Sequence, residues 1–201
     1  MQRRHSLIFL LLGLGHPARA HREPGDTADP AAQAFPHAEQ RANHEVRGWP
    51  LDDFTLTDHN AQAFTPERLR GRWTFVLLGD TSRCATACGE ALATLAGLCQ
   101  RIARTEAIKT TQVLFISRDA QHDTPQRLGA FLAPFNPRFI GATGSEATLA
   151  SLAGDLAGGS AAAPRNSLVL IGPDAMLRVE YLPPFDVQML TADYLKTRLR
   201  N

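Results

Sequence analysis

A continuous apolar run, WTFVLLG at Trp73–Gly79, leads within a few residues into an amphipathic helical pattern. Such a run, without polar alternation, is typical of a strand that is covered on both faces of its sheet. In the segment that follows, Leu92, Leu95, Leu98 and Ile102 fall on one face at helical spacing. A doubly covered strand that leads directly into a helix predicts an α/β architecture, in which helices pack against a sheet.

The alternation of strand and helix patterns continues to the end of the chain. QVLFISRD predicts the next buried strand, and DTPQRLGAFLA predicts a helix with Asp123 as its N-cap and Pro125 in its first turn. A short strand in FIGATG, a helix capped by Ser145, a hairpin around Gly172–Ala175 and a last amphipathic helix follow, while DFTLTD predicts a strand upstream. This order predicts a thioredoxin-like α/β fold, with a central mixed sheet flanked by helices and a CxxxC motif at the N-terminus of the first helix.

The N-terminal residues predict export. Residues 1–20 combine a basic start, a short apolar run and the small-residue pattern Ala18-Arg19-Ala20, as a cleaved signal peptide does. The apolar run is shorter than the roughly 17–25 residues that span a bilayer, so we expect no transmembrane span in the mature chain. Residues 21–47 lack apolar periodicity and are expected to form a flexible arm before one domain over residues 48–201. The predicted location is the periplasm.

Charge and cysteine content narrow the possible partners and roles. With 21 basic and 20 acidic residues and a formal charge of +1, the chain has no overall basic field to attract nucleic acid or an anionic membrane. Three cysteines are too few for a disulfide-stapled mini-domain, and an odd number leaves at least one thiol with another role. Cys99 lies on the apolar helix face, so we expect it to be buried and inert.

Cys84 and Cys88 stand four residues apart at the predicted junction of strand and helix. Unpaired backbone N–H groups at a helix N-terminus favour the thiolate, which is the reactive form of cysteine. If both residues were helical, their Cβ atoms would lie about 5–6 Å apart, too far for a disulfide. With Cys84 in the loop and Cys88 in the first turn, the pair can form a disulfide or bind a soft metal such as Cu(I). The residues themselves leave both possibilities open, together with a disulfide of purely structural role.

The chain resembles the Sco/SenC family in three segments, FTLTDHNAQAFTPERLRGRWTFVLLGDTSRCATAC, LFISRDAQHDTPQRLGAFLAPFNPRFIGATGS and SLVLIGPD. The most specific match combines Asp123-Thr124-Pro125 with Phe139-Ile140-Gly141, and the resemblance runs from about Trp49 to the last helix. It implies a thioredoxin-like fold in which two cysteines and a distant histidine bind copper. It also implies a role as a copper chaperone, or as a thiol-disulfide reductase for the copper-bearing subunit of cytochrome oxidase.

Cys84 and Cys88 match the two cysteines of the family, but the histidine is missing. The resemblance places it at Pro164, or at most at Arg165 or Asn166, and none of these side chains can replace an imidazole on copper.

The cysteine loop departs from the family as well. Ala85, Thr86 and Gly89 stand where the usual Cys-Pro-Asp-x-Cys-Pro form has its prolines and acid. We expect the looser loop to weaken metal affinity more than disulfide formation. His122, just before the Asp-Thr-Pro motif, is the candidate for a substitute third ligand, ahead of His59.

The sequence therefore supports three hypotheses. In the first, a periplasmic Sco-like protein assists assembly of the cytochrome oxidase copper site by thiol-disulfide chemistry, with Cys84 as the attacking thiol and Cys88 as the resolving thiol. Its partner would be the copper-bearing oxidase subunit or another periplasmic thiol protein. In the second, a Cu(I) metallochaperone uses Cys84, Cys88 and a substitute or exogenous third ligand, for which His122 is the candidate side chain. In the third, a structural paralogue holds the two cysteines in a locked disulfide.

Overall fold

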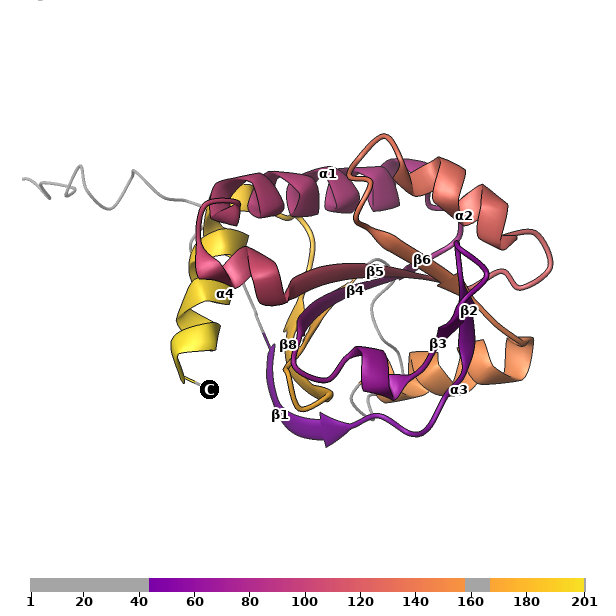
Figure 1. Cartoon of the computed structure of the whole chain (residues 1–201), viewed down its shortest axis with the longest axis horizontal. Coiled ribbons are helices and arrows are strands. Elements are labelled where there is room, and N and C mark those ends of the chain that lie inside the picture. The colour runs from indigo at the N-terminus through magenta and orange to yellow at the C-terminus, as the bar shows by residue number, and fades with distance from the viewer. Residues whose placement is uncertain (1–43, 158–166, 201) are drawn as a thin grey trace, which may run out of the picture. The chain divides into compact units, whose positions relative to one another are not determined.

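The structure, a computed structural model, describes residues 44–157 and 167–200, all within the compact unit Glu39–Asn201. The predicted signal peptide, the predicted arm up to residue 43 and the positions expected for the family histidine lie outside the described residues. One eight-stranded sheet forms the centre of the unit, in the order β1-β8-β7-β4-β5-β6-β2-β3 (Figure 1). The strands are β1 (His44–Pro50), β2 (Leu56–Asp58), β3 (Ala63–Phe64), β4 (Trp73–Gly79), β5 (Thr111–Ser117), β6 (Ile140–Thr143), β7 (Leu168–Ile171) and β8 (Met176–Tyr181).

The sheet is mixed, as predicted. β4 pairs in parallel with β5 and antiparallel with β7, and β5 pairs in parallel with β6. Every residue of β4 is buried, because the strand has a neighbour on each side and packed side chains on both faces. The parallel register, for example Phe75 opposite Val113, brings the carboxyl ends of β4 and β5 to one edge of the sheet and their amino ends to the other.

Helices cover both faces of the sheet. They are α1 (Ala85–Ile102), α2 (Pro125–Leu132), α3 (Glu146–Leu156) and α4 (Val187–Arg200), with short 3-10 turns η1 (Pro66–Arg68) and η2 (Glu106–Thr110). α1, α2 and α4 lie on one face and α3 on the other (Figure 1). Ser145 caps α3 as predicted, accepting a hydrogen bond from the backbone of Thr148. The predicted thioredoxin-like α/β fold is confirmed. No helix among residues 44–157 and 167–200 is long and apolar enough to cross a membrane.

The N-terminal part of the sheet differs from the prediction. β1 begins at His44, so the domain boundary expected between residues 47 and 48 falls inside a strand that pairs with β8. The strand predicted over DFTLTD is limited to Leu56–Asp58. β2 is short because the strands beside it are the two-residue β3 and the four-residue β6.

Candidate functional site at the carboxyl ends of β4 and β5

Cys84 and Cys88 are joined by a disulfide at the start of α1, with 5.3 Å between their Cα atoms. Cys84 is the N-cap residue and Cys88 lies in the first turn, where its backbone N–H donates to the carbonyl of Cys84 at 2.6 Å. Cys84 is partly exposed, whereas Cys88 is fully buried. The two sulfurs are therefore unequal, and Cys84 is the one that is accessible from solvent.

Gly79, the last residue of β4, leaves room for the disulfide because it has no side chain. A Cβ atom at this position would lie 2.5 Å from the Sγ atoms of both Cys84 and Cys88, closer than real Cβ contacts come. Cys84 Sγ also lies 3.2 Å from the carbonyl oxygen of Asp80. The strand must end in a residue without a side chain for the sulfurs to pack against it.

Asp123 holds the loops of this edge together. It is 1% exposed, and its carboxylate accepts hydrogen bonds from the Thr81 backbone at 3.1 Å, the Thr81 hydroxyl at 2.5 Å and the Ser117 hydroxyl at 2.7 Å. The prediction that Asp123 is the N-cap of α2 was wrong. Thr124 is the cap and accepts from the backbone of Arg127. Asp123 instead joins the loop after β4 to the end of β5.

The charged side chains around the disulfide are mostly paired. Arg83 lies 3.5 Å from a carboxylate oxygen of Asp80 and 3.6 Å from one of Asp119. Arg83 and Arg118 line both the hollow beside Cys84, of about 710 Å³, and a second hollow of about 380 Å³ that contains Asp119 and His122. The two hollows therefore adjoin through these arginines.

His122 is an exposed loop residue whose ring nitrogen Nδ1 lies 2.9 Å from Asp119. The hydrogen bond from His122 holds the pKa of the Asp119 carboxyl below its usual range. Because an ionised carboxylate only accepts, Nδ1 carries the proton, and in the neutral ring Nε2 is the nitrogen with a free lone pair. This is the orientation of a ligand histidine supported by a carboxylate.

The structure does not gather the candidate metal ligands. Within the part of the chain that it describes, no three His, Cys, Asp or Glu side chains form a group suited to a metal ion. His59 lies elsewhere, where its Nδ1 accepts a hydrogen bond from the backbone of Gly141 at 3.1 Å. With the disulfide closed, neither sulfur is a thiolate. The role of His122 as a third ligand stays a prediction.

The family model described as SCO1/SenC matches residues 46–164, more than half of the chain. The chain belongs to the SCO1/SenC family. A Stutzerimonas stutzeri protein named for copper binding is 30% identical over 150 residues, which cover 70% of this chain and 72% of the relative. The mitochondrial protein SCO2 of Saccharomyces cerevisiae is 39% identical over 92 residues, covering 46% of this chain and 30% of that protein.

Solved Sco structures share the fold. Copper-bound ScoI of Arabidopsis thaliana superposes with a TM-score of 0.65 at 24% identity, covering 75% of this chain and 98% of that one. BsSco, a member of the Sco family of cytochrome c oxidase assembly proteins in which a disulfide switch was identified, gives a TM-score of 0.61 at 18% identity. Its alignment covers 76% of this chain and 95% of BsSco.

In this SCO1/SenC chain, sequence reasoning found the cysteines and missed the residues that position them. Gly79 was part of the recognised strand, but the contact that excludes a side chain there comes from residues further along the chain. The signal for Asp123 was its place in the Asp-Thr-Pro motif, which also fits a cap. Cys99 is buried as expected, and burial raises the pKa of its thiol, which disfavours the reactive thiolate.

Proposed function

We propose that this SCO1/SenC protein assists assembly of the copper site of cytochrome oxidase through thiol-disulfide exchange at Cys84 and Cys88. The observation that carries the proposal is the pairing of a partly exposed and a buried cysteine in one disulfide at the N-terminus of α1. Exchange needs one sulfur that a partner can reach and a second within bonding distance of the first. The N-terminus of α1 favours negative charge, and hence the thiolate, at this position.

The reduced protein would act in two steps. The Cys84 thiolate attacks one sulfur of a partner disulfide, the partner's S–S bond breaks, and one partner sulfur leaves as a thiolate. The Cys88 thiolate then attacks Cys84 Sγ and displaces the second partner sulfur, so that two electrons pass to the partner and the Cys84–Cys88 disulfide forms. A dithiol reductant must reduce this disulfide before another cycle.

The proposed partner is the copper-bearing subunit of cytochrome oxidase or another periplasmic thiol protein. Support comes from family membership and from the description of the Sco family as cytochrome c oxidase assembly proteins. The signal peptide over residues 1–20 and the periplasmic location belong to the same proposal, because an oxidising compartment is where a disulfide pair is used.

An exchange assay tests this function. Reduced protein is mixed with a peptide whose two cysteines are joined by a disulfide, and the peptide dithiol is followed by mass spectrometry. We expect the wild type and Cys99→Ala to reduce the peptide and Cys84→Ser to fail. If Cys84→Ser reduces the peptide as fast as the wild type, Cys84 is not the attacking thiol. If the native disulfide resists excess dithiol that reduces the unfolded chain, the locked structural disulfide is the correct hypothesis.

Copper as cargo is the second candidate, because structures of Sco proteins from Arabidopsis thaliana, yeast and Bradyrhizobium japonicum contain it. The two cysteines can bind copper only after the disulfide is reduced, when Cys84 and Cys88 offer two soft thiolates to Cu(I). His122 would add an imidazole nitrogen from the adjoining hollow. Anaerobic Cu(I) titration against a competing chelator tests this role. We expect one equivalent that Cys84→Ser loses, and loss in His122→Ala would identify the third ligand. Binding too weak to compete with the chelator would exclude the chaperone role.

A further inference from the structure

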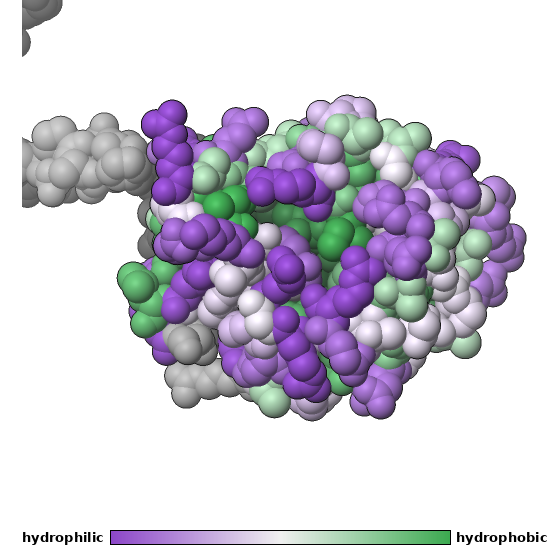
Figure 2. All heavy atoms as spheres, in the orientation of Figure 1, coloured by the Kyte–Doolittle hydropathy of each residue, from purple (hydrophilic) through white to green (hydrophobic). Residues whose placement is uncertain are grey.

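A third cavity lies at the opposite end of the parallel strands, where β4 and β5 begin. Its volume is about 490 Å³, and its walls come from η1 and the turn after it, from the start of β5, and from the loop that leads into β6. Figure 2 shows this side of the molecule hollowed, with an apolar floor between hydrophilic side chains. The disulfide at the carboxyl ends of the same strands does not contribute to this cavity.

The floor of this cavity is apolar. It includes the buried side chains of Val113 and Phe139 and the partly buried Ile108 and Ile140. Cys99 of α1 also contributes to the wall. These residues form the bottom of a hollow that is open to solvent and that an apolar group of moderate size can cover.

The walls are cationic, and two of their arginines have no acidic partner among the side chains that the structure describes. Five arginine or lysine side chains and one glutamate line the cavity: Arg68, Arg70, Arg72, Lys109, Arg138 and Glu67. Arg68 is bound to Asp58 at 2.7 Å and Lys109 to Glu106 at 2.7 Å. Glu67 acts electrostatically on Arg70. Among the side chains that the structure describes, in residues 48–157 and 167–200, no carboxylate forms an ion pair with Arg72 or Arg138.

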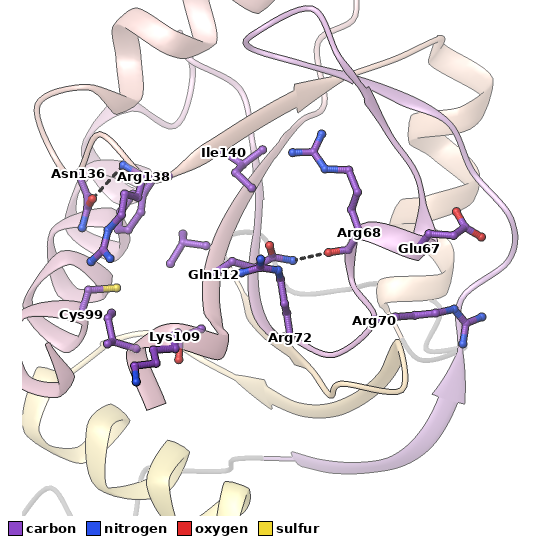
Figure 3. A pocket seen from close by; sticks show the side chains of 14 residues that line it. Glu67, Arg68, Arg70, Arg72, Cys99, Lys109, Gln112, Asn136, Arg138 and Ile140 are labelled. Carbon is purple, nitrogen blue, oxygen red and sulfur yellow. Dashed lines mark hydrogen bonds between the residues drawn. The ribbon is translucent and has the colours of Figure 1, made fainter. Parts of the chain in front are cut away.

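The surroundings of these two arginines are fixed. In Figure 3 Arg138 lies with Asn136 and Cys99 at one side of the cavity, and Arg72 lies with Gln112 in the middle. The Asn136 side chain accepts from the backbone N–H of Arg138 at 3.0 Å. The Gln112 amide donates to the Arg68 carbonyl at 3.0 Å and to the Thr74 hydroxyl at 2.8 Å. The backbone at Arg138 and the side chain of Gln112 are therefore held by hydrogen bonds.

We propose that this cavity binds a small amphipathic organic anion, whose carboxylate, phosphate or sulfonate head pairs with Arg72 and Arg138 and whose apolar body covers the partly buried Ile108 and Ile140. Guanidinium groups bind the oxygens of carboxylate and phosphate groups through paired hydrogen bonds, which suits them to an anionic head group. An apolar floor with few polar anchors, and a volume within about 300–1,000 Å³, is typical of sites for small molecules. The site is independent of the exchange chemistry at Cys84 and Cys88.

Fluorescence titration with 8-anilinonaphthalene-1-sulfonate, an amphipathic anion, tests the proposal. The matched probe is N-phenyl-1-naphthylamine, which has the same ring system without the sulfonate. The variants are Arg72→Gln, Arg138→Gln and the double variant, and the control is Arg104→Gln, an exposed arginine outside the cavity. We expect the double variant to bind the anionic probe about tenfold more weakly and the neutral probe unchanged. Equal weakening of both probes, or no weakening of the anionic one, would overturn the proposal.

Competition measurements identify the occupant. Octanoate should displace the anionic probe, and octanol and tetraglutamate should not. Displacement by tetraglutamate alone would show that the site takes an acidic peptide instead. Circular dichroism confirms that each variant is folded.

Discussion

The two ends of the parallel strands β4 and β5 use charge in opposite ways. At the carboxyl ends, Asp123 is buried and holds three hydrogen bonds, and Asp80 and Asp119 share Arg83. At the amino ends, Arg72 and Arg138 line a cavity without an acidic partner among the residues that the structure describes.

This difference separates two roles for polar groups. A buried carboxylate that is fully hydrogen-bonded fixes the geometry of its neighbours, and its removal leaves donors without partners. An exposed cation without a partner adds little to stability and remains available to a ligand. We therefore expect substitutions at the disulfide end to cost stability and substitutions at the cavity end to cost affinity.

Removal of the Asp123 carboxylate should have the largest effect. We expect Asp123→Ala to lower the free energy of unfolding by about 3 kcal/mol, because it leaves the buried Ser117 hydroxyl and the Thr81 donors without their acceptor. Urea unfolding measures this loss. Asp123→Asn, which keeps one acceptor oxygen, should lose less, and Asp53→Ala, at an exposed position, should lose almost nothing. Equal stability of Asp123→Ala and Asp53→Ala would remove the contrast between the two ends.

Reduction of the disulfide should have the next largest effect. A loop this short gives about 2 kcal/mol by loop-closure entropy, and this contribution is lost when Cys84 and Cys88 are reduced. Urea unfolding with and without a dithiol measures the difference, and Cys84→Ser should show no further change on reduction.

The cavity at the other end of the strands should bind 8-anilinonaphthalene-1-sulfonate equally in the oxidised and reduced states. A large change in that affinity would show that the two ends are coupled.

Acid should reduce the contribution to stability of Asp58, whose carboxylate pairs with Arg68 of the cavity wall. Burial alone would raise the pKa of the Asp58 carboxyl, but hydrogen bonds from Arg68 and from two backbone N–H groups hold it below its usual range. A carboxyl with a lower pKa in the folded chain stabilises the fold above about pH 4, and that contribution is lost as the pH falls through the folded pKa. The stability gap between the wild type and Asp58→Asn should therefore shrink below pH 4. A gap independent of pH would contradict this assignment.

Loss of the unpaired cations should have the smallest effect on stability. We expect Arg72→Gln and Arg138→Gln each to change the free energy of unfolding by less than about 0.5 kcal/mol, since neither breaks an ion pair that the structure shows. Thermal unfolding compared with Arg104→Gln measures this. A loss as large as that of Asp123→Ala would mean that these arginines are structural.

The sequence predicts the elements that depend on local patterns. Trp73–Gly79 was predicted as a strand and β4 has these bounds, because a continuous apolar run has few alternatives to a central strand. β1 was missed because its sequence, HEVRGWP, lacks alternation, and its structure depends on pairing with β8 more than a hundred residues away.

In the candidate site, too, the sequence predicts the features that depend on local patterns and not those that depend on distant residues. The spacing of Cys84 and Cys88 and the helical pattern after them were enough to place both sulfurs at the start of α1. The Asp123 network was not predicted because its partner Thr81 is 42 residues away, and a local capping rule gave another role. The cationic cavity was not predicted because its arginines come from separate segments, each of which has an ordinary charge pattern.

Mixed-disulfide trapping tests the central claim most directly. Reduced Cys88→Ser and Cys84→Ser are each mixed with the cyclic disulfide peptide, and the adducts are identified by intact mass and peptide mapping. We expect Cys88→Ser to accumulate a stable adduct at Cys84, because the attacking thiol is present and the resolving thiol is absent. Cys84→Ser should form little adduct, because Cys88 is buried. An adduct at Cys88 and none at Cys84, or none in either variant, would contradict the account.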